Sequence, residues 1–408
     1  MTRHAFVFAA VLAVSASASA QSTDISEVRR KARAQAGPVY LTPAIELKEL
    51  GVDSNVFNAP GDERSDFTVT VTPRVDVWIP VARRALVKAK VAADLVWFAR
   101  YTSERSVDPQ IVARAETYFR RLTLFAENAY LDTRQRPNHE IDVRSRRFEN
   151  TALGGVGLTL TPKLSIQATA RRFHTRYDAD AGSEGADLQR TLNRTATGVQ
   201  ATAHHRLTPF TTIGLRYDNL LDRFEFVPAR DARSSRVMPG VEFSPGALIN
   251  GRAYVGYREF TPVRPDVLPA FNGLVAELEL TYTLLGATSF GVRFRRDLAY
   301  SYEEEQPYFV ENIVGGYVRR ALGSRFDVLL SADRHRYEYE DFASGRAGSN
   351  VAPQRIDHTW NYAASVGYRM GRHGRVGFGV SYWARHSTTR RFRDYNSLRI
   401  GTTASYGF

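Results

Sequence analysis

Three polar side chains with nucleophilic or acid–base character lie two residues apart in one predicted strand. Ser331, Asp333 and His335 share one face of that strand, because alternate residues of a strand point the same way. A barrel-embedded esterase or peptidase could use a serine, an acid and a histidine. However, neighbours on one face are separated by about 6.6 Å along a strand, too far for a preformed hydrogen-bonded triad. A hydrolase therefore stays the alternative interpretation, and we predict no catalytic residue and no enzyme activity.

Metal and cofactor sites find little support in the sequence. The chain has no cysteine, which excludes disulfides and thiolate ligands. His204 and His205 are adjacent, so on a strand they point to opposite faces and cannot chelate one ion together. The Asp53-Ser54-Asn55 segment is more typical of a loop held by Asx hydrogen bonds than of a calcium site. We predict no metal ion and no cofactor.

Arginine dominates the charge of the chain. The net charge is +12, and of 55 basic residues only five are lysine. Strand parity predicts that part of this charge faces the inside of a barrel. Two interpretations stay open: the charges pair across strands as struts, or basic rings favour anions or acidic sugars. The predicted inward residues are Lys88, Lys90, Arg171, Arg216, Arg252, Arg293, Arg295, Asp297 and Arg399.

Strands with a two-residue period position these side chains. From Phe67 to Thr72 and from Val376 to Tyr382, apolar residues alternate with small or polar ones, the pattern of a strand with two different faces. About eighteen such blocks follow one another. Every second connection between them is a short turn, and the intervening ones are longer and polar. This pattern is typical of an outer-membrane barrel with periplasmic turns and extracellular loops.

The predicted fold is therefore all-β: a closed, antiparallel, up-and-down transmembrane barrel of about 18 strands (16–18). The alternative fold is a soluble β-sandwich. Barrels of about 16–18 strands have room for an aqueous channel. Tyrosines near strand ends also predict two aromatic belts at the membrane interfaces. Toward the long loops these are Tyr101, Tyr130, Tyr177, Tyr217, Tyr257, Tyr300, Tyr337 and Tyr382, and toward the short turns Tyr282, Tyr317, Tyr368 and Tyr406.

The two ends of the chain carry targeting signals. Arg3 and His4, an apolar stretch at 5–14, and small residues at 18–20 predict a signal peptide over 1–20. Residues 21–38 then form a basic periplasmic tail, disordered or briefly helical, and 39–408 the barrel. Tyr406 and Phe408 at the carboxyl end are similar to the signal by which barrel precursors reach the barrel-assembly machinery.

Several short motifs occur in a familiar order: GVDSNVF at 51–57, SDF at 65–67, TP at 72–73, RLTL at 121–124, LTPKLS at 160–165, GVEF at 240–243, GYR at 256–258 and RD at 296–297. In this order the chain resembles the β-barrel porins often associated with exopolysaccharide-export systems in Gram-negative bacteria. A glycine just before Asp53 departs from the tyrosine often found there. The resemblance implies an outer-membrane pore or export barrel, and it supplies no binding residue.

The predicted function is a water-filled outer-membrane channel for polar or anionic solutes, with saccharides or exopolysaccharide export as its narrower form. The alternatives are the integral hydrolase and a non-conducting structural barrel or adhesin. The expected partners are outer-membrane lipid, the barrel-assembly machinery and polysaccharide-export components, and no nucleic acid. The oligomeric state, the solute and the open or plugged state of the pore stay undecided at this point.

Overall fold

One large closed sheet forms most of the described structure, and β9 and β10 make a separate two-stranded sheet. The computed structural model describes Val28 and residues 32–81, 84–179, 181–183, 185–265, 268–340, 355–371 and 373–407. The main sheet has 19 strands, and without the three-residue β1 it leaves 18 barrel strands, each hydrogen-bonded antiparallel to its neighbours in sequence. The last strand, β21, pairs with the first, β2, and closes the barrel. The prediction of a closed barrel of about 18 strands is confirmed, and the alternative of two stacked sheets is wrong.

The barrel strands are β2 (Val39–Asp53), β3 (Asp66–Val81), β4 (Ala85–Phe98), β5 (Ser106–Tyr118), β6 (Leu122–Thr133), β7 (Arg147–Thr159), β8 (Leu164–Tyr177), β11 (Arg194–Arg206), β12 (Thr211–Phe224), β13 (Ala232–Phe243), β14 (Ile249–Pro262), β15 (Phe271–Leu284), β16 (Thr288–Tyr300), β17 (Tyr308–Leu322), β18 (Phe326–Glu340), β19 (Ile356–Met370), β20 (Gly374–Ser387) and β21 (Tyr395–Tyr406). The smaller elements are β1 (Ala34–Ala36), β9 (Gly182–Ser183), β10 (Ala186–Asp187), α3 (Leu188–Leu192) and 3-10 turns at Thr102–Glu104, Pro228–Arg230 and Arg391–Arg393. Among the described residues, no helix is long and apolar enough to cross a membrane.

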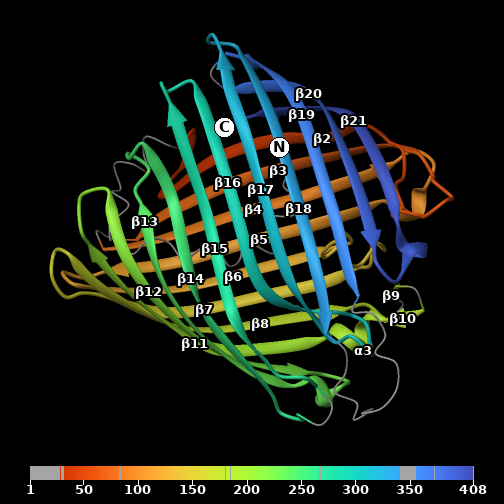
Figure 1. Ribbon diagram of the computed structural model, residues 1–408. Helices are drawn as coiled ribbons and strands as arrows, with labels where there is room; N and C mark the ends of the chain where they lie inside the picture. The colour runs from red at the N-terminus through yellow and green to blue at the C-terminus, as the bar shows by residue number, and fades with distance from the viewer. Residues whose placement is uncertain are drawn as a thin grey trace.

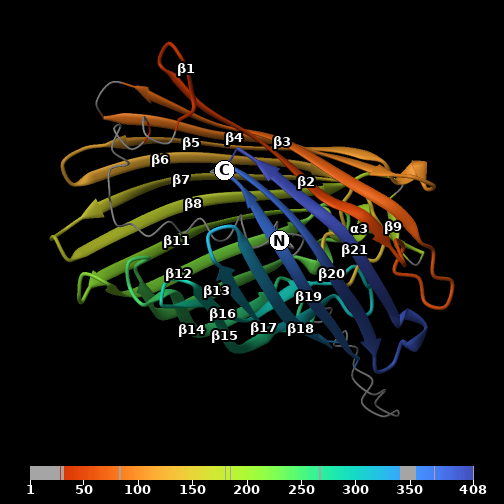
Figure 2. The same cartoon turned by 90° about the horizontal axis from the view of Figure 1, so that it is seen from above.

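The strands of the front and back walls of the barrel run at an angle to each other when the barrel is viewed from the side. In Figure 1 the red-to-green strands of the first half run behind the green-to-blue strands of the second half. The view from above in Figure 2 shows α3 and β9 at one end of the barrel. These elements belong to a long connection, so this is the long-loop end. Because barrels of this type turn tightly in the periplasm, the long-loop end is extracellular.

Strand alternation separates an apolar outside from a polar inside. On β12, Ile213, Leu215 and Tyr217 are exposed large hydrophobic side chains. Arg216 and Asp218, at the alternate positions of the same strand, are buried. A soluble protein would hide the apolar set and expose the charged one. The reverse arrangement fits a wall with lipid outside and a polar lumen inside.

The predicted tyrosine belts hold only in part. Tyr217, Tyr257, Tyr382, Tyr368 and Tyr406 are exposed on the outer face, as a belt requires. Other tyrosines predicted for the belts point inward. They occupy strand positions that alternate with the outward-facing ones, or they lie at a strand end that leans into the barrel. Buried or inward-facing tyrosines are Tyr177, Tyr300, Tyr337 and Tyr317.

The start of the chain folds back on the barrel. β1 pairs with the first residues of β2, so residues 34–36 are extended where a disordered or helical tail was predicted. Val28 packs against Tyr40 and Leu86. The predicted signal peptide at 1–20, most of the predicted tail and Phe408 lie outside the described residues.

A bulge interrupts β2 near its middle. The register with β21 shifts between Leu47 and Leu50, and Glu49 adopts a φ of 55°. At Gly51 an added Cβ would collide with the Ile400 carbonyl oxygen of β21. The glycine that departs from the family pattern is therefore required by the close approach of the two strands that close the barrel.

Inward rings lie flat over glycines of neighbouring strands. The Tyr254 ring of β14 covers Gly240 of β13, and its hydroxyl donates to Glu242 at 2.6 Å. The Arg216 guanidinium lies 4.4 Å from the centre of the same ring. A Cβ at Gly240 would collide with this ring and with the Ala253 carbonyl oxygen. The glycine thus makes the space that the ring fills.

Gly240→Ala tests this packing. Because a backbone oxygen lies in the way of the new methyl group, we expect the free energy of unfolding to fall by about 1–3 kcal/mol. The measurement is urea unfolding in detergent, followed by the different gel mobility of folded and heated protein. Gly154→Ala is the matched control, because a Cβ there meets nothing within 4 Å. Equal unfolding midpoints for the two variants would contradict the packing role.

Candidate functional site in the barrel lumen

The nine residues predicted to line the lumen lie on the face opposite the exposed apolar side chains. On β4, Lys88 and Lys90 share a face with the buried Asp94, while Val91 and Leu95 point outward. The same parity places the others on β8, β12, β14, β16 and β21. The site is therefore a polar interior whose character depends on how these charges are paired.

Arginines share carboxylates in a network on β8 and β12–β16. Arg236 contacts Asp218 at 3.0 Å and Asp297 at 2.9 Å. Arg171 lies 3.4 Å from Asp218, and Arg258 lies 2.6 Å from Asp297. Three guanidinium groups thus share two carboxylates in these contacts, and Asp222, which interacts with Arg171 and Arg258, adds a third carboxylate nearby.

In each of two smaller networks, two arginines share one carboxylate. Glu277 of β15 is shared by Arg216, at 3.3 Å, and Arg252, at 2.6 Å. Near the short turns, arginines of β19 and β20 lie 3.8 and 2.5 Å from the Asp327 carboxylate. We name the inward face of β8, β12–β16 and β18–β20 the basic sector.

Lysine and arginine also pair with carboxylates on the remaining wall. Lys48 contacts Asp94 at 3.0 Å and a second carboxylate of its own strand at 3.9 Å. Arg399 of β21 lies between Asp53, at 2.5 Å, and Glu49. With the two inward lysines of β4 counted, cations and carboxylates on β2–β4 and β21 are close to balance.

The remaining predicted residues differ in their pairing. Lys88 contacts Glu116 at 3.1 Å, and Arg293 contacts Asp333 at 2.7 Å. Lys90 lies opposite Asp76 in the register of β3 and β4. Arg295 makes no direct ion pair within the described part of the chain, but on the inward face of β16 it lies close enough to the Asp297 and Glu311 carboxylates to interact with both.

A loop from one wall reaches the opposite wall. Residues 134–146 join β6 to β7, and strand order places β18 on the far side of the barrel from them. Near its start, the Gln135 amide donates to Asp94 of β4 at 3.0 Å. Further along, the His139 ring lies 4.5 Å from the His335 ring of β18 and 5.2 Å from the Trp383 ring of β20. We name residues 134–146 the crossing loop.

Charge pairs anchor the crossing loop on the far wall. Asp142 accepts from the Arg385 guanidinium of β20 at 2.9 Å. Arg385 also donates to Asp357 at 2.7 Å, and Asp357 accepts from Arg355 at 2.6 Å. These guanidinium groups are buried, so each interaction is little screened by water.

Glu140 is the buried carboxyl at the turn of the crossing loop. It accepts from the Ser301 hydroxyl at 2.5 Å, and its backbone oxygen accepts from Arg393 at 2.6 Å. Burial raises the pKa of Glu140 from 4.5 to about 7, against the opposing effect of Ser301, Arg355 and Arg393. Burial also lowers the pKa of His139 well below its usual 6.5. Glu140 is therefore the group of this loop that changes charge near neutral pH.

Other long loops pack on the crossing loop. Ile141, only 1% exposed, joins a buried apolar cluster with Leu188 of α3 and Tyr302 of the β16–β17 loop. The Arg230 guanidinium ties this cluster together by donating to the Thr191 oxygen at 2.9 Å and to the Pro307 oxygen at 2.6 Å. Burial lowers the pKa of Arg230 to about 10. A solute that enters from the extracellular end meets these packed loops first.

Two of the three candidate hydrolase residues are engaged with other side chains. Asp333 is held by Arg293, and His335 lies 3.6 Å from Glu311 and 3.3 Å from the Tyr337 hydroxyl. Ser331 shares their face but is bonded to neither in the described structure. The strand spacing thus assembles no triad from these residues.

The other chemical candidates have structural roles. His204 points inward, 3.4 Å from Glu242, and His205 is exposed on the other face. Asp53 accepts from the Asn55 backbone at 3.0 Å and from the Ser397 hydroxyl at 2.6 Å, which holds the start of the loop. In the described residues no cluster of three or more histidines and carboxylates could hold a metal ion.

Comparison with known families agrees with this architecture. Residues 34–406 match the family described as "Putative beta-barrel porin 2". The chain belongs to this family. The protein is accordingly a porin-like β-barrel of the Gram-negative outer membrane, and such families are in general non-enzymatic. A search of curated protein sequences found no match.

Solved outer-membrane barrels are similar to this porin in overall shape. OpdO of Pseudomonas aeruginosa is 10% identical, with 90% of this chain and 96% of that chain covered and a TM-score of 0.49. OpdK of Pseudomonas aeruginosa is 10% identical, with 90% and 98% covered and a TM-score of 0.47. The siderophore receptor PirA of Pseudomonas aeruginosa is 8% identical, with 90% and 80% covered and a TM-score of 0.44.

The raised pKa of Glu140 predicts a pH dependence of the crossing loop. The pKa of Glu140 in the folded protein lies above its ordinary value of 4.5. The arrangement in which the crossing loop contacts the far wall is therefore most stable below pH 4.5, and it loses stability as pH rises through about 7. Single-channel recording of the wild type from pH 5 to pH 8 should therefore show an open fraction that increases with pH.

Glu140→Gln should make this open fraction independent of pH over the same range, because the amide keeps the Ser301 contact and cannot ionise. Burial lowers the pKa of His139 well below 6.5, so the slope is assigned to Glu140. A wild-type open fraction that is flat, or a Gln variant that keeps the slope, would show that another group controls the loop.

Proposed function

We propose that this porin is a gated diffusion channel for small polar solutes that carry a carboxylate or phosphate group. The arginines that share carboxylates in the basic sector carry the proposal. Guanidinium groups bind planar anions through two parallel hydrogen bonds, and a guanidinium that shares its carboxylate keeps donors for a second anion. The carboxylates among these arginines orient a solute that has both an anionic end and hydroxyl or amino groups.

The crossing loop supplies the gate. It is anchored to the far wall by Asp142 and Arg385 and stacked against His335 and Trp383. A solute can pass this level only when the loop moves aside, because its buried contacts occupy the space between the walls. Selection would then combine charge in the lumen with the free energy of releasing the loop.

The narrower prediction concerns acidic saccharides and exopolysaccharide export. Arginines of the basic sector suit the carboxylates of such sugars, and polysaccharide-export components would be the partners on the periplasmic side. Passage of a polymer requires the crossing loop to stay displaced for the whole transit. Transport of small anionic solutes needs only brief opening, and we therefore favour it.

A non-conducting barrel is the second candidate, and the packed loops favour it. If Arg230, Ile141 and the crossing loop stay in place at all times, the extracellular mouth is a rigid surface. Planar-bilayer recording separates the two functions, because a rigid barrel gives no conductance steps in any salt.

Arg295→Gln tests the origin of anion selection. The reversal potential in a salt gradient should show anion preference in the wild type. Loss of one unit charge about 5 Å from a permeating ion removes about 0.8 kcal/mol of attraction for an anion and about the same repulsion for a cation in water, so the anion-to-cation permeability ratio should fall by a factor of about 15. Arg296→Gln is the matched control, since Arg296 lies on the outer face and is held by Asn312 and the Leu274 oxygen. An equal change in both variants, or cation preference in the wild type, would overturn the proposal.

A chemical tether tests the gate. The chain has no cysteine, so His139→Cys and His335→Cys together introduce the only reactive pair. A short bifunctional thiol reagent should join the crossing loop to β18 and abolish conductance, and a reducing agent should restore it. Each single cysteine variant is a control for simple modification. Unchanged conductance after complete cross-linking would show that ions do not pass the crossing loop.

A further inference from the structure

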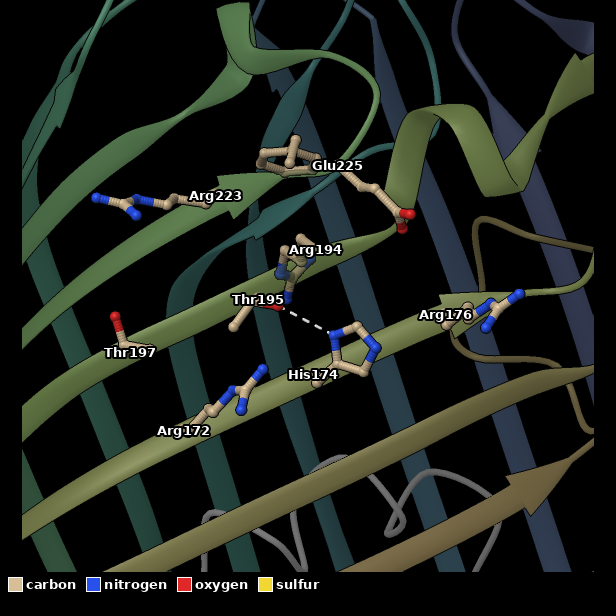
Figure 3. A pocket seen from close by; sticks show the side chains of 9 residues that line it. Arg172, His174, Arg176, Arg194, Thr195, Thr197, Arg223 and Glu225 are labelled. Carbon is tan, nitrogen blue, oxygen red and sulfur yellow. Dashed lines mark hydrogen bonds between the residues drawn. The ribbon is translucent and has the colours of Figure 1, made fainter.

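A group of basic side chains lies on the outer, lipid-facing wall at the extracellular end. Arg172, His174 and Arg176 alternate along β8 with Arg171, Phe173 and Thr175, which face the lumen side. Arg223 lies at the matching level of β12 and is exposed. Figure 3 shows these side chains along neighbouring strands at the edge of the wall.

The strand register arranges these residues in rows around an open depression of about 650 Å³. His174 pairs with Thr195 of β11, and Thr195 pairs with Arg223. The His174 ring and the Thr195 hydroxyl are hydrogen-bonded at 3.0 Å (Figure 3). Arg172 pairs with a second threonine, so two hydroxyls lie between the basic side chains.

Three of the four arginines that line this depression have no ion-pair partner in the described structure, whereas the fourth, Arg194, lies 3.4 Å from Asp222. Arg172, Arg176 and Arg223 make no ion pair within the described part of the chain. Other exposed arginines near the same end do: Arg146 contacts Asp132 at 2.8 Å, and several more are paired in this way. The one carboxylate nearby, Glu225, accepts from the Asn193 amide at 3.0 Å. Three cations are thus left for an external anion.

The apolar band of the barrel begins directly beside the basic group. Val199, Leu215 and Tyr217 are exposed on the same strands toward the middle of the wall. The outward side chains therefore change from charged to apolar along these strands. A ligand in the depression therefore has its anionic part among the arginines and an apolar part along the wall below.

We propose that this depression binds the phosphate groups of the phosphorylated glycolipid in the outer leaflet, with its acyl chains lying against Val199 and Leu215. Guanidinium forks match phosphate oxygens in geometry and charge. The threonine hydroxyls add donors between them. The site is separate from the lumen, because its side chains project from the opposite face of the same strands.

The test uses the full-length barrel in detergent and the combined variant Arg172→Gln, Arg176→Gln and Arg223→Gln. Native mass spectrometry measures binding of diphosphorylated lipid A, of the same lipid without phosphates, and of inorganic phosphate as a competitor. We expect the variant to bind the phosphorylated lipid roughly 100-fold more weakly, since each arginine near an anionic lipid surface contributes about a factor of five.

The control removes the same charge from the other end. Arg120→Gln, Arg121→Gln and Arg320→Gln change exposed residues near the short turns and should leave lipid binding as in the wild type. Equal loss in the control, equal binding of the dephosphorylated lipid, or no loss in the first variant would overturn the proposal. Displacement of the lipid by millimolar inorganic phosphate would also overturn it, because it would show a simple phosphate site.

Discussion

The absence of hydrogen-bonding solvent in the hydrocarbon core of a membrane is the constraint on which this structure depends. Each backbone amide and carbonyl in the wall must find a partner within the protein. The pairing of β2 with β21 meets this demand, because it removes the two free edges that an open sheet would have. The bulge at Glu49 and the close contact at Gly51 lie at this seam, where the first and last strands must fit together.

Closure then fixes the environment of every side chain. One face of each strand contacts lipid, and the other contacts a confined polar space in which charges are close together. In that space an arginine is stabilised only beside carboxylates or water. The shared arrangement of Arg236 between Asp218 and Asp297 answers this need. Most lumen charges in the described structure are therefore paired as struts, and anion selection by the shared arginines belongs to the proposed function.

The long loops give the barrel its second polar layer. Ile141 and Tyr302 come from different loops but share one apolar cluster, so the loops behave as a packed unit and not as separate surface segments. Buried groups such as Glu140 and Arg230 stay in this unit because each finds a hydrogen-bond partner from another loop. A packed unit with titratable groups inside can respond to pH, whereas free surface loops could not.

The strands, their two faces and the closed barrel could be predicted from the amino-acid pattern, because a two-residue period places the apolar side chains on the face that contacts lipid. The same period predicts which side of the wall Arg293 and Asp297 occupy. Their partners depend on the fold, since Arg293 meets Asp333 and Asp297 meets Arg236 through the register of distant strands. The path of residues 134–146 was likewise beyond the sequence. The apolar Ile141 was only a weak sequence signal that this segment is buried. The contacts of residues 134–146 form only after the far wall is in place.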